Sequence, residues 1–369
     1  MANFPIVATR RVRSTPFTER VEASGLSGYT VYNHMLLPTS FGSLEDNYHH
    51  LKKYVQIWDV AVERQVELRG PDAHKLAVMM SARDLTNAEP GRCYYAPITD
   101  HNGGMLNDPI AICLAPDRFW FSIADSDMML WALGLAHGMK LDVDVFEPDV
   151  SPLAIQGPLA DDLMAEVFGD EIRSTGFFRF QWFEWRGRKL AIARSGWSKQ
   201  GGFEIYLDDS SLGLQLWDDL WAKGEPYNLQ AGCPNYIERI EGGLLSFGSD
   251  MTREDTPLEA GLDRYINLDN HEFIGRGALR AQAESGVKKQ LVGLRIEGTP
   301  IPPLDIPEDC QINGKRIGML TSAVFSPDFS ANLGFAMLDI AHTKLGTKIQ
   351  LQYKGESRNA EVCAIPFTN

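Results

Sequence analysis

Short strand patterns and amphipathic helix patterns are interspersed along this chain, without the regular strand–helix–strand alternation of a doubly wound sheet. Strands are predicted at residues 119–124, 189–193, 203–207 and 348–353, which are rich in β-branched or aromatic residues and bounded by turn formers. Helical spacing of apolar residues is found at 72–82, 158–168 and 212–221, the last preceded by Ser211 as a candidate cap. This mixture favours an α+β fold.

The composition changes near residue 280. Residues 282–289 are polar, and the chain beyond them shows short strand patterns separated by turns such as Asn313–Gly314 and Lys354–Gly355. We therefore expect a separate, β-rich C-terminal domain of about 85 residues. The full length of 369 residues suggests two or three domains in all.

The longest apolar run covers residues 128–136, which is nine residues where a membrane span needs about twenty. With Asp127 near its start, the run predicts a buried helix. No apolar stretch follows Arg10, Arg11 and Arg13, so we expect no signal peptide. The five cysteines are widely spaced and form no C-x-x-C pair, which indicates reduced thiols in a cytoplasmic protein.

Charge and missing motifs exclude several classes of function. The formal net charge of −14 argues against nonspecific nucleic-acid binding and against a polybasic membrane surface, but leaves an anionic small ligand open. No Rossmann, P-loop, nucleophile-elbow or H-E-x-x-H motif occurs. His49 and His50 are adjacent and would point to different sides, so we expect a surface pair without a shared metal. Neither a nucleotide nor a metal cofactor is expected.

Four motifs, in this order, resemble the T-protein family of folate-dependent aminomethyltransferases. They are Gly103-Gly104-Met-Leu-Asn-Asp108, Ile155-Gln-Gly-Pro158, Gly201-Gly-Phe-Glu204, and Leu320-Thr-Ser322 with Ser326-Pro327. The resemblance covers nearly the whole chain. It implies a three-domain cloverleaf around a folate channel, made of a discontinuous folate-binding domain (1–55 and 147–280), an inserted α+β domain (56–146) and the β-rich domain (281–369).

One segment departs from the glycine-cleavage pattern. That family usually has Thr-Gly-Tyr-Thr-Gly-Glu where this chain has Ser195-Gly-Trp-Ser-Lys-Gln200. Together with residues 29–38, 93–97 and 232–235, this segment is similar to the branch of the superfamily that demethylates dimethylsulfoniopropionate. The resemblance implies methyl transfer from that sulfonium to tetrahydrofolate, giving 3-(methylthio)propionate and 5-methyltetrahydrofolate.

Two alternatives stay open. One is another folate-dependent O- or N-demethylase or aminomethyltransferase, and the other is a noncatalytic folate-binding regulatory protein. In each case the expected partners are small molecules, with neither nucleic acid nor membrane, and a homodimer is compatible with the resemblance.

The donor site implied by the resemblance needs an aromatic face and an anion-binding group. Trp197 is the first candidate for the sulfonium, because an indole face attracts a cation, and Tyr32 and Phe247 could supply further aromatic walls. His34 and Lys199 are the candidates for the donor carboxylate. Core packing of the aromatic residues and a surface position for Lys199 are the structural alternatives.

The folate site implied by the resemblance is centred on two carboxylates. Asp108 precedes Pro109, which favours extended backbone, and a carboxylate there could orient the pterin or accept the N5 proton as the catalytic group. Glu204 lies in an otherwise apolar strand and would match pterin N–H donors, with Tyr206 on the same face. Tyr95 and Arg239 complete the set. Structural pairing is the favoured interpretation of Arg239, within a helix that also carries Glu241.

Overall fold

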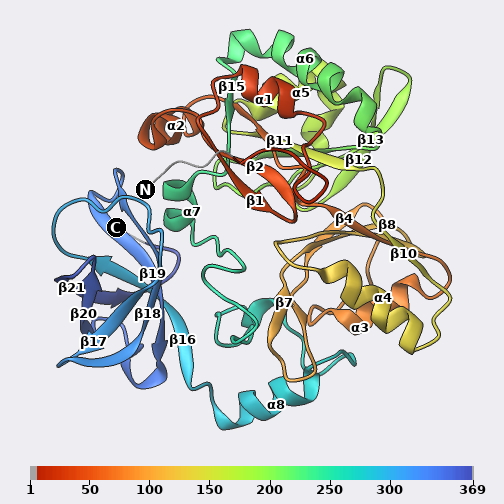
Figure 1. The fold of residues 1–369 in the computed structure, drawn as a ribbon. Coiled ribbons are helices and arrows are strands. Elements are labelled where there is room, and N and C mark those ends of the chain that lie inside the picture. Colours follow the sequence, from red (N-terminus) through yellow and green to blue (C-terminus); the bar gives the residue numbers. More distant parts are fainter. Residues whose placement is uncertain (1–5, 368–369) are drawn as a thin grey trace. The chain divides into compact units, whose positions relative to one another are not determined.

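The computed structural model describes residues 6–367, which divide into two compact units (Figure 1). The first unit comprises the chain up to Ala77 together with Leu85–Tyr95 and Pro109–Asn235. The second comprises Val78–Asp84, Ala96–Asp108 and the chain from Tyr236 onward. Helix α3 (Ala73–Met80) contains the first crossing between them.

A six-stranded sheet forms the centre of the first unit. Its order is β12 (Phe180–Trp185), β13 (Arg188–Ala193), β14 (Gly202–Leu207), β11 (Ser151–Gln156), β3 (Gln56–Asp59) and β15 (Gln230–Gly232). All neighbours are antiparallel except β15 and β3. The central register aligns Ala154 of β11 with Glu204 of β14 on one side and with Trp58 of β3 on the other.

The two faces of this sheet have different neighbours, because side chains alternate along each strand. Phe203 and Ile205 of β14 share one apolar core with α5 (Ala160–Phe168) and α6 (Gly213–Gly224), which cover that face (Figure 1). The intervening Tyr206 points the other way, into a cluster with Trp120 and Ile112. Glu204 shares this second face with Tyr206, as the sequence predicted.

The second face of the sheet meets a five-stranded antiparallel sheet. Its order is β10 (Asp144–Phe146), β4 (Gln65–Arg69), β9 (Arg118–Ser122), β8 (Ile110–Ala115) and β5 (Arg92–Tyr95). Helix α4 (Met128–Gly138) follows β9. Helices α1 (Thr18–Ala23) and α2 (Leu44–Leu51) and the hairpin of β1 (Gly28–Tyr32) and β2 (Met35–Ser40) complete the unit.

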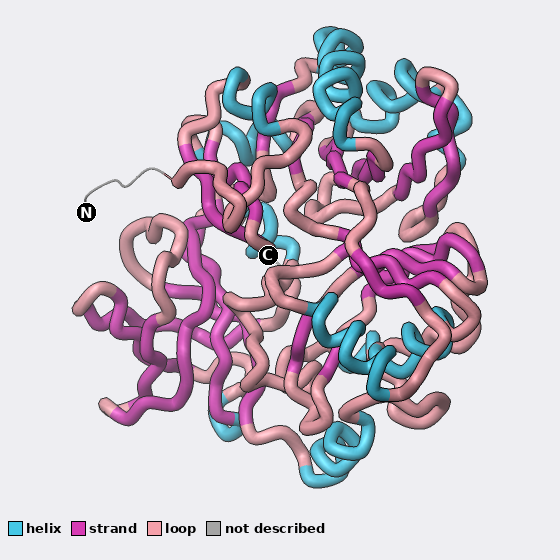
Figure 2. Tube along the Cα trace, turned by 45° about the vertical axis from the view of Figure 1, so that its right-hand side comes forward, coloured by secondary structure: helices cyan, strands magenta, loops and turns pink. Residues whose placement is uncertain are grey.

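The second unit ends in a closed barrel (Figure 2). The barrel strands, in spatial order, are β16 (Lys289–Ile296), β19 (Ala331–Asp339), β18 (Lys315–Ser326), β17 (Glu308–Ile312), β20 (Lys348–Tyr353) and β21 (Glu356–Cys363). Before the barrel come the small sheet of β6 (Ile98–Thr99) and β7 (Met105–Asn107), and helices α7 (Tyr236–Gly242) and α8 (Arg276–Ser285). Five 3₁₀ turns lie between these elements among residues 6–367.

The four strand predictions are confirmed to within two residues at either end. The predicted helices correspond to α3, α5 and α6, and the helix predicted over 128–136 corresponds to α4, which begins directly after Asp127. Two local predictions are wrong. Ser211 does not cap α6, because it lies in a 3₁₀ turn (Ser210–Leu212) whose N-terminus is capped by Asp209. Helix α4 is only partly buried: Met128 and Ala132 face the core, whereas Leu130 is 63% exposed. Within residues 6–367, no helix is both long and apolar enough to cross a membrane.

Candidate active site

The segment 195–201 joins β13 to β14, and the side chain of Gln156 holds it. The Gln156 amide nitrogen donates to the Ser195 carbonyl oxygen over 3.0 Å, and its amide oxygen accepts from the Ser198 hydroxyl over 2.7 Å. Gln156 is 1% exposed, so both of its polar atoms are satisfied by this segment inside the protein. We call residues 195–201 the clamped turn. The Gln156 amide thus connects the motif at residues 155–158 with the segment at residues 195–200.

Glycine is required within the clamped turn, at Gly196, and directly after it, at Gly202. A Cβ atom on Gly196 would lie 2.1 Å from the Gln156 amide nitrogen, and one on Gly202 would lie 2.2 Å from the Ile155 carbonyl oxygen. Both glycines also have positive φ, at 140° and 146°. The turn therefore lies directly on the end of β11, and Trp197 and Lys199 are positioned by its backbone.

Glu204 is buried beside the clamped turn. The hydroxyls of Ser195 and Tyr206 both donate to its Oε2 atom, the latter over 3.3 Å. Among residues 6–367 they are the two groups that donate to this carboxyl, so Oε1 has no protein donor. Burial raises the pKa of Glu204, and the two hydroxyl hydrogen bonds oppose that rise. Burial and the neighbouring Glu204 raise the pKa of Tyr206 well above its ordinary value.

The other first-unit candidates differ in exposure. Trp197, Tyr32 and Tyr95 are half-buried, which fits a pocket wall as well as packing, whereas Lys199 is exposed. Tyr95 ends β5, the strand that also contains buried Cys93, and Cys93 belongs to the same apolar cluster as Tyr206. Glu204 and Tyr206 therefore lie together on β14, and Trp197 and Lys199 lie in the turn that precedes this strand.

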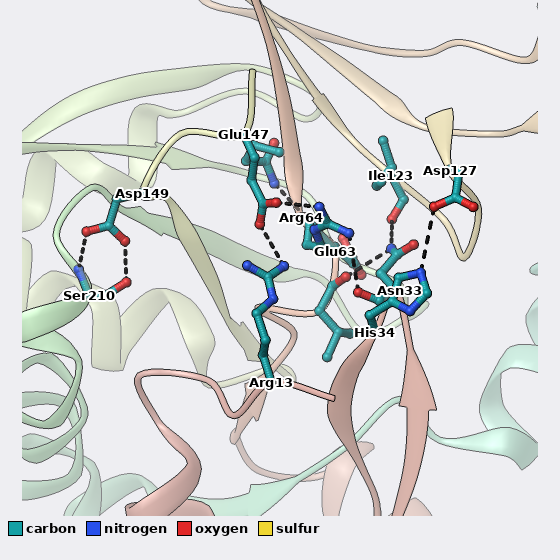
Figure 3. A network of polar contacts seen from close by, with 12 residues as sticks. Arg13, Asn33, His34, Glu63, Arg64, Ile123, Asp127, Glu147, Asp149 and Ser210 are labelled. Atoms are coloured by element: carbon teal, nitrogen blue, oxygen red, sulfur yellow. Dashed lines mark hydrogen bonds and ion pairs between the residues drawn. The ribbon is translucent and has the colours of Figure 1, made fainter. Parts of the chain in front are cut away.

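His34 lies at the tip of the β1–β2 hairpin. Asn33 and His34 both have positive φ, at 49° and 61°, which is the geometry of a two-residue hairpin turn. Asn33 is buried, and its amide donates to the carbonyl oxygens of Val62 and Ile123 (Figure 3). His34 is exposed, and its Nε2 lies 3.7 Å from a carboxylate oxygen of Asp127. The role of His34 in binding the donor's carboxylate stays a prediction.

Two arginines share one carboxylate near this hairpin. Glu147 pairs with Arg13 at 2.8 Å and with Arg64 (Figure 3), and both arginines hold the pKa of Glu147 below its ordinary value against the effect of burial. The main chain of Arg13 also bonds to the hairpin, through an N–H donated to the His34 carbonyl oxygen over 2.8 Å. The ion pairs therefore tie the N-terminal segment to the body of the first unit.

Asp108 belongs to the second unit, directly after β7. The turn that leads into β7 needs both of its glycines: a Cβ atom on Gly103 would lie 3.0 Å from the Leu279 side chain, and one on Gly104 would lie 2.4 Å from the Arg253 carbonyl oxygen. Asp100 closes the turn by accepting from the Gly104 N–H over 3.1 Å. Asp108 itself is half-buried at the exit of this rigid hairpin.

Arg239 is held by a buried carboxylate. Its guanidinium donates to Asp250 over 2.6 Å and to the Ser322 hydroxyl over 2.6 Å, and it is 3% exposed. Asp250 also accepts from the hydroxyls of Thr321 and Ser322 on β18. These contacts support structural pairing for Arg239, while its contact with a folate tail stays a prediction. Glu241 has the same kind of role, because it accepts from the Ser326 hydroxyl over 2.5 Å.

The C-terminal motif therefore has a structural function. Ser322 and Ser326 of the barrel strand β18 hold α7 and the segment that follows it, on which half-buried Phe247 lies. The sequence analysis missed Asp250 as the centre of this network. The sequence could have indicated this ion pair, since Asp250 and Arg239 are charged residues within a largely apolar stretch.

Asp59 is a second residue that the sequence analysis missed. Its carboxylate ends β3, is 2% exposed, and accepts from the Thr15 hydroxyl over 2.5 Å and from the Ala61 N–H over 3.1 Å. Burial raises its pKa to about 7, against the effect of both hydrogen bonds. No motif marks it, because its burial depends on the N-terminal residues that cover it.

The histidine prediction is half right. His49 is exposed beside Glu45, but His50 is buried, with its Nε2 2.9 Å from the Asn228 carbonyl oxygen, so the two do form different contacts. Over residues 6–367, no group of three or more His, Cys, Asp or Glu side chains is arranged to hold a metal ion.

Comparison with known families identifies the architecture. Residues 17–270 match the family model described as the GCVT N-terminal domain, and residues 289–369 match the one described as the glycine cleavage T-protein C-terminal barrel domain. The chain belongs to the glycine cleavage T-protein family. The α+β class and the β-rich C-terminal domain are thereby confirmed; the three-domain division and its boundaries stay a prediction.

Three relatives illustrate the range of the family. The chain is 51% identical to the dimethylsulfoniopropionate demethylase DmdA of Ruegeria pomeroyi, covering 94% of this chain and 95% of that protein. It is 26% identical to an aminomethyltransferase of Lysinibacillus sphaericus, covering 97% and 98%. The crystal structure of aminomethyltransferase T from Bartonella henselae superposes with a TM-score of 0.86 at 22% identity, covering 96% and 98%, which shows the shared fold.

Proposed function

We propose that this protein transfers a methyl group from dimethylsulfoniopropionate to tetrahydrofolate. The 51% identity to a dimethylsulfoniopropionate demethylase over nearly the full length of both chains carries the proposal. The clamped turn supports it, because Trp197 and Lys199 follow closely after Ser195, whose hydroxyl donates to buried Glu204.

The reaction needs alignment more than activation. A sulfonium methyl already has a neutral thioether as its leaving group. The N5 lone pair of the folate forms the new C–N bond, the C–S bond breaks with its electron pair going to sulfur, and the N5 proton leaves. The products are 3-(methylthio)propionate and 5-methyltetrahydrofolate. Holding two reactants in line can lower the barrier by up to roughly 7–11 kcal/mol.

Each candidate residue has a place in this scheme. Glu204 is the acceptor for pterin N–H groups, because its Oε1 has no donor among residues 6–367. Trp197 faces the sulfonium, and Lys199 and His34 are the candidates for its carboxylate. Tyr32 and Phe247 are further walls. Asp108 accepts the N5 proton directly or through water. Tyr95, Tyr206 and Arg239 complete the folate site.

Product analysis tests the proposal. The pure protein is incubated with both substrates under reducing, anaerobic conditions, and both products are measured. We expect them to form in equal amounts. No product with dimethylsulfoniopropionate, but turnover of an O-methyl, N-methyl or aminomethyl donor from a panel, would assign another folate-dependent transfer. Folate binding without turnover of any donor would assign a regulatory protein. Light scattering of the same sample tests the proposed homodimer.

A further inference from the structure

Helix α4 of the first unit has an exposed apolar side (Figure 1). Its sequence is apolar almost all round, which is typical of a helix that is covered on every side. Met128, Ala132 and Ala136 are buried. On the opposite side of the helix, Leu130 is 63% exposed and Leu133 is 39% exposed. The burial predicted from the sequence is therefore met on one side only.

Gly134 lies in the middle of the exposed side and is not required by its own chain. A Cβ atom on Gly134, or on Gly138 one turn later, would meet nothing within 4 Å in the part of the chain that the structure describes. Neither glycine has a positive φ. Glycine destabilises the interior of a helix relative to alanine. The open space at Gly134 is, however, what a second helix needs for a close approach.

We infer that the exposed side of α4 binds a second copy of this chain, with the two helices antiparallel about a two-fold axis. We call this side the α4 face, and it consists of Leu130, Leu133, Gly134 and His137. The interface is isologous, so both copies supply the same residues. The contact goes beyond the proposed methyl transfer and does not depend on it.

The shape of the α4 face is complementary to itself in one antiparallel register. With the two-fold axis between residues 133 and 134, Leu133 of each copy lies over Gly134 of the other. Leu130 lies over His137 in the same register. The two leucines fill the spaces at the two glycines, which lets the helix axes approach to about 8 Å. Apolar surface that one copy exposes is thereby removed from water.

The same register pairs opposite charges at both ends of the contact. Asp127 precedes Leu133 by six positions and Lys140 follows Gly134 by six, so Asp127 of one copy faces Lys140 of the other. The Asp127 side chain is 70% exposed, and exposed Lys140 forms no ion pair within residues 6–367. Antiparallel helices also place opposite ends of their dipoles side by side. This charge complementarity favours a second copy as the occupant.

Sedimentation velocity over a range of protein concentrations measures the association. Two helices of three turns make a small interface, so we expect a reversible dimer with a Kd on the order of 1–100 μM. Leu133→Glu places two charges at the centre of the contact and should raise Kd by about 30-fold or more. Leu345→Glu is the matched control, since Leu345 is 63% exposed outside the α4 face, and it should leave Kd unchanged.

Gly134→Ala separates association from folding, because its two effects have opposite signs. The added methyl group improves helix propensity, so the urea midpoint of unfolding at low protein concentration should rise. The same methyl group holds the two helices apart, so Kd should rise by about five-fold or more. Gly277→Ala in α8 is the control: its Cβ atom also meets nothing within 4 Å, and Kd should stay unchanged.

Charge reversal tests the register. Asp127→Lys and Lys140→Asp should each raise Kd by about 2- to 30-fold, and the double variant should return it to within about three-fold of the wild type. Asp127 makes no side-chain capping hydrogen bond, so its replacement leaves the hydrogen bonds of α4 intact.

Three results would overturn the inference. They are a wild-type protein that stays monomeric at about 200 μM, a dimer whose Kd Leu133→Glu leaves unchanged, and a double charge variant that is no better than the single ones. Cosedimentation of the monomer with phosphatidylcholine vesicles, abolished by Leu133→Glu, would assign the α4 face to a lipid surface instead. Leu133→Glu and Gly134→Ala should still form 3-(methylthio)propionate. Absence of product from the wild-type protein would reject the proposed function and not the dimer.

Discussion

Asp108, the proposed acceptor of the N5 proton, follows a hairpin whose two glycines lie in close contacts. Asp108→Asn keeps the size of the group but cannot accept a proton. We expect kcat to fall about 10²–10⁴-fold, with each KM changed only a few-fold. Asp117→Asn, an exposed carboxylate at the β8–β9 turn, is the control and should retain full activity. Initial rates that match the wild type would remove Asp108 from the reaction.

Substitution of Trp197 tests how the donor is recognised. Trp197→Leu keeps an apolar side chain but removes the indole face, so the affinity for dimethylsulfoniopropionate should fall about 2- to 30-fold, equivalent to about 0.5–2 kcal/mol. The product 3-(methylthio)propionate, whose thioether sulfur carries no positive charge, should be much less affected. Trp221→Leu, on the outer side of α6 and 40% exposed, is the control. Calorimetry that shows equal losses for both ligands would contradict a cation–π role.

Asp59 makes stability depend on pH. Its pKa is about 7 in the folded protein and about 3.9 in an unfolded chain, so the folded state binds the extra proton. The stability that this proton provides is complete below about pH 4 and is lost as the pH rises through about 7. In Asp59→Asn the amide still pairs with Thr15 and Ala61 without a charge.

Urea unfolding at pH 5 and pH 9 measures this effect. From pH 5 to pH 9, the free energy of unfolding of Asp59→Asn should increase relative to that of the wild type by on the order of 2–4 kcal/mol. If the free energies of unfolding of the variant and the wild type differ by the same amount at both pH values, Asp59 is ionised throughout.

At the scale of elements, the junction between the clamped turn and β14 depends on which of Gly201 and Gly202 contacts β11. Gly202→Ala would place a Cβ atom 2.2 Å from the Ile155 carbonyl oxygen at a φ of 146°, whereas Gly201→Ala meets nothing within 4 Å at a φ of 78°. We expect Gly202→Ala to lower the free energy of unfolding by about 3–5 kcal/mol and Gly201→Ala by about 1–2 kcal/mol. Chemical denaturation of both variants decides this. Equal losses would mean that backbone conformation alone matters.

Elements were easier to predict than the contacts between them. Strand β14 was read correctly because alternation and propensity are local, and the shared face of Glu204 and Tyr206 followed from the same alternation. The hydrogen bond from the Gln156 amide to the Ser195 carbonyl oxygen could not be predicted from the sequence, since it joins residues 39 positions apart. Ser211 was misassigned because a 3₁₀ turn capped by Asp209 precedes α6 and contains Ser211.

At the scale of the whole molecule, the net charge of −14 repels every anionic ligand. Folate carries two carboxylates, and dimethylsulfoniopropionate has no net charge. Raising NaCl from about 20 to 200 mM shortens the Debye length, so the affinity for folate should stay constant or improve, and that for the donor should change less than two-fold. Calorimetry at both salt concentrations measures this. A marked loss of folate affinity would instead indicate a basic cluster around its tail.

The pairing of β16 with β21 sets an order of events during synthesis. The six-stranded sheet of the first unit is complete once Gly232 of β15 is available to β3, but the barrel closes only when Cys363 reaches Gly293. About 130 residues separate these two points, which is on the order of ten seconds of translation. The nascent chain therefore has time to fold its first unit while the barrel is still an unclosed sheet. Interruption during that interval would leave unpaired strand edges on an otherwise folded protein.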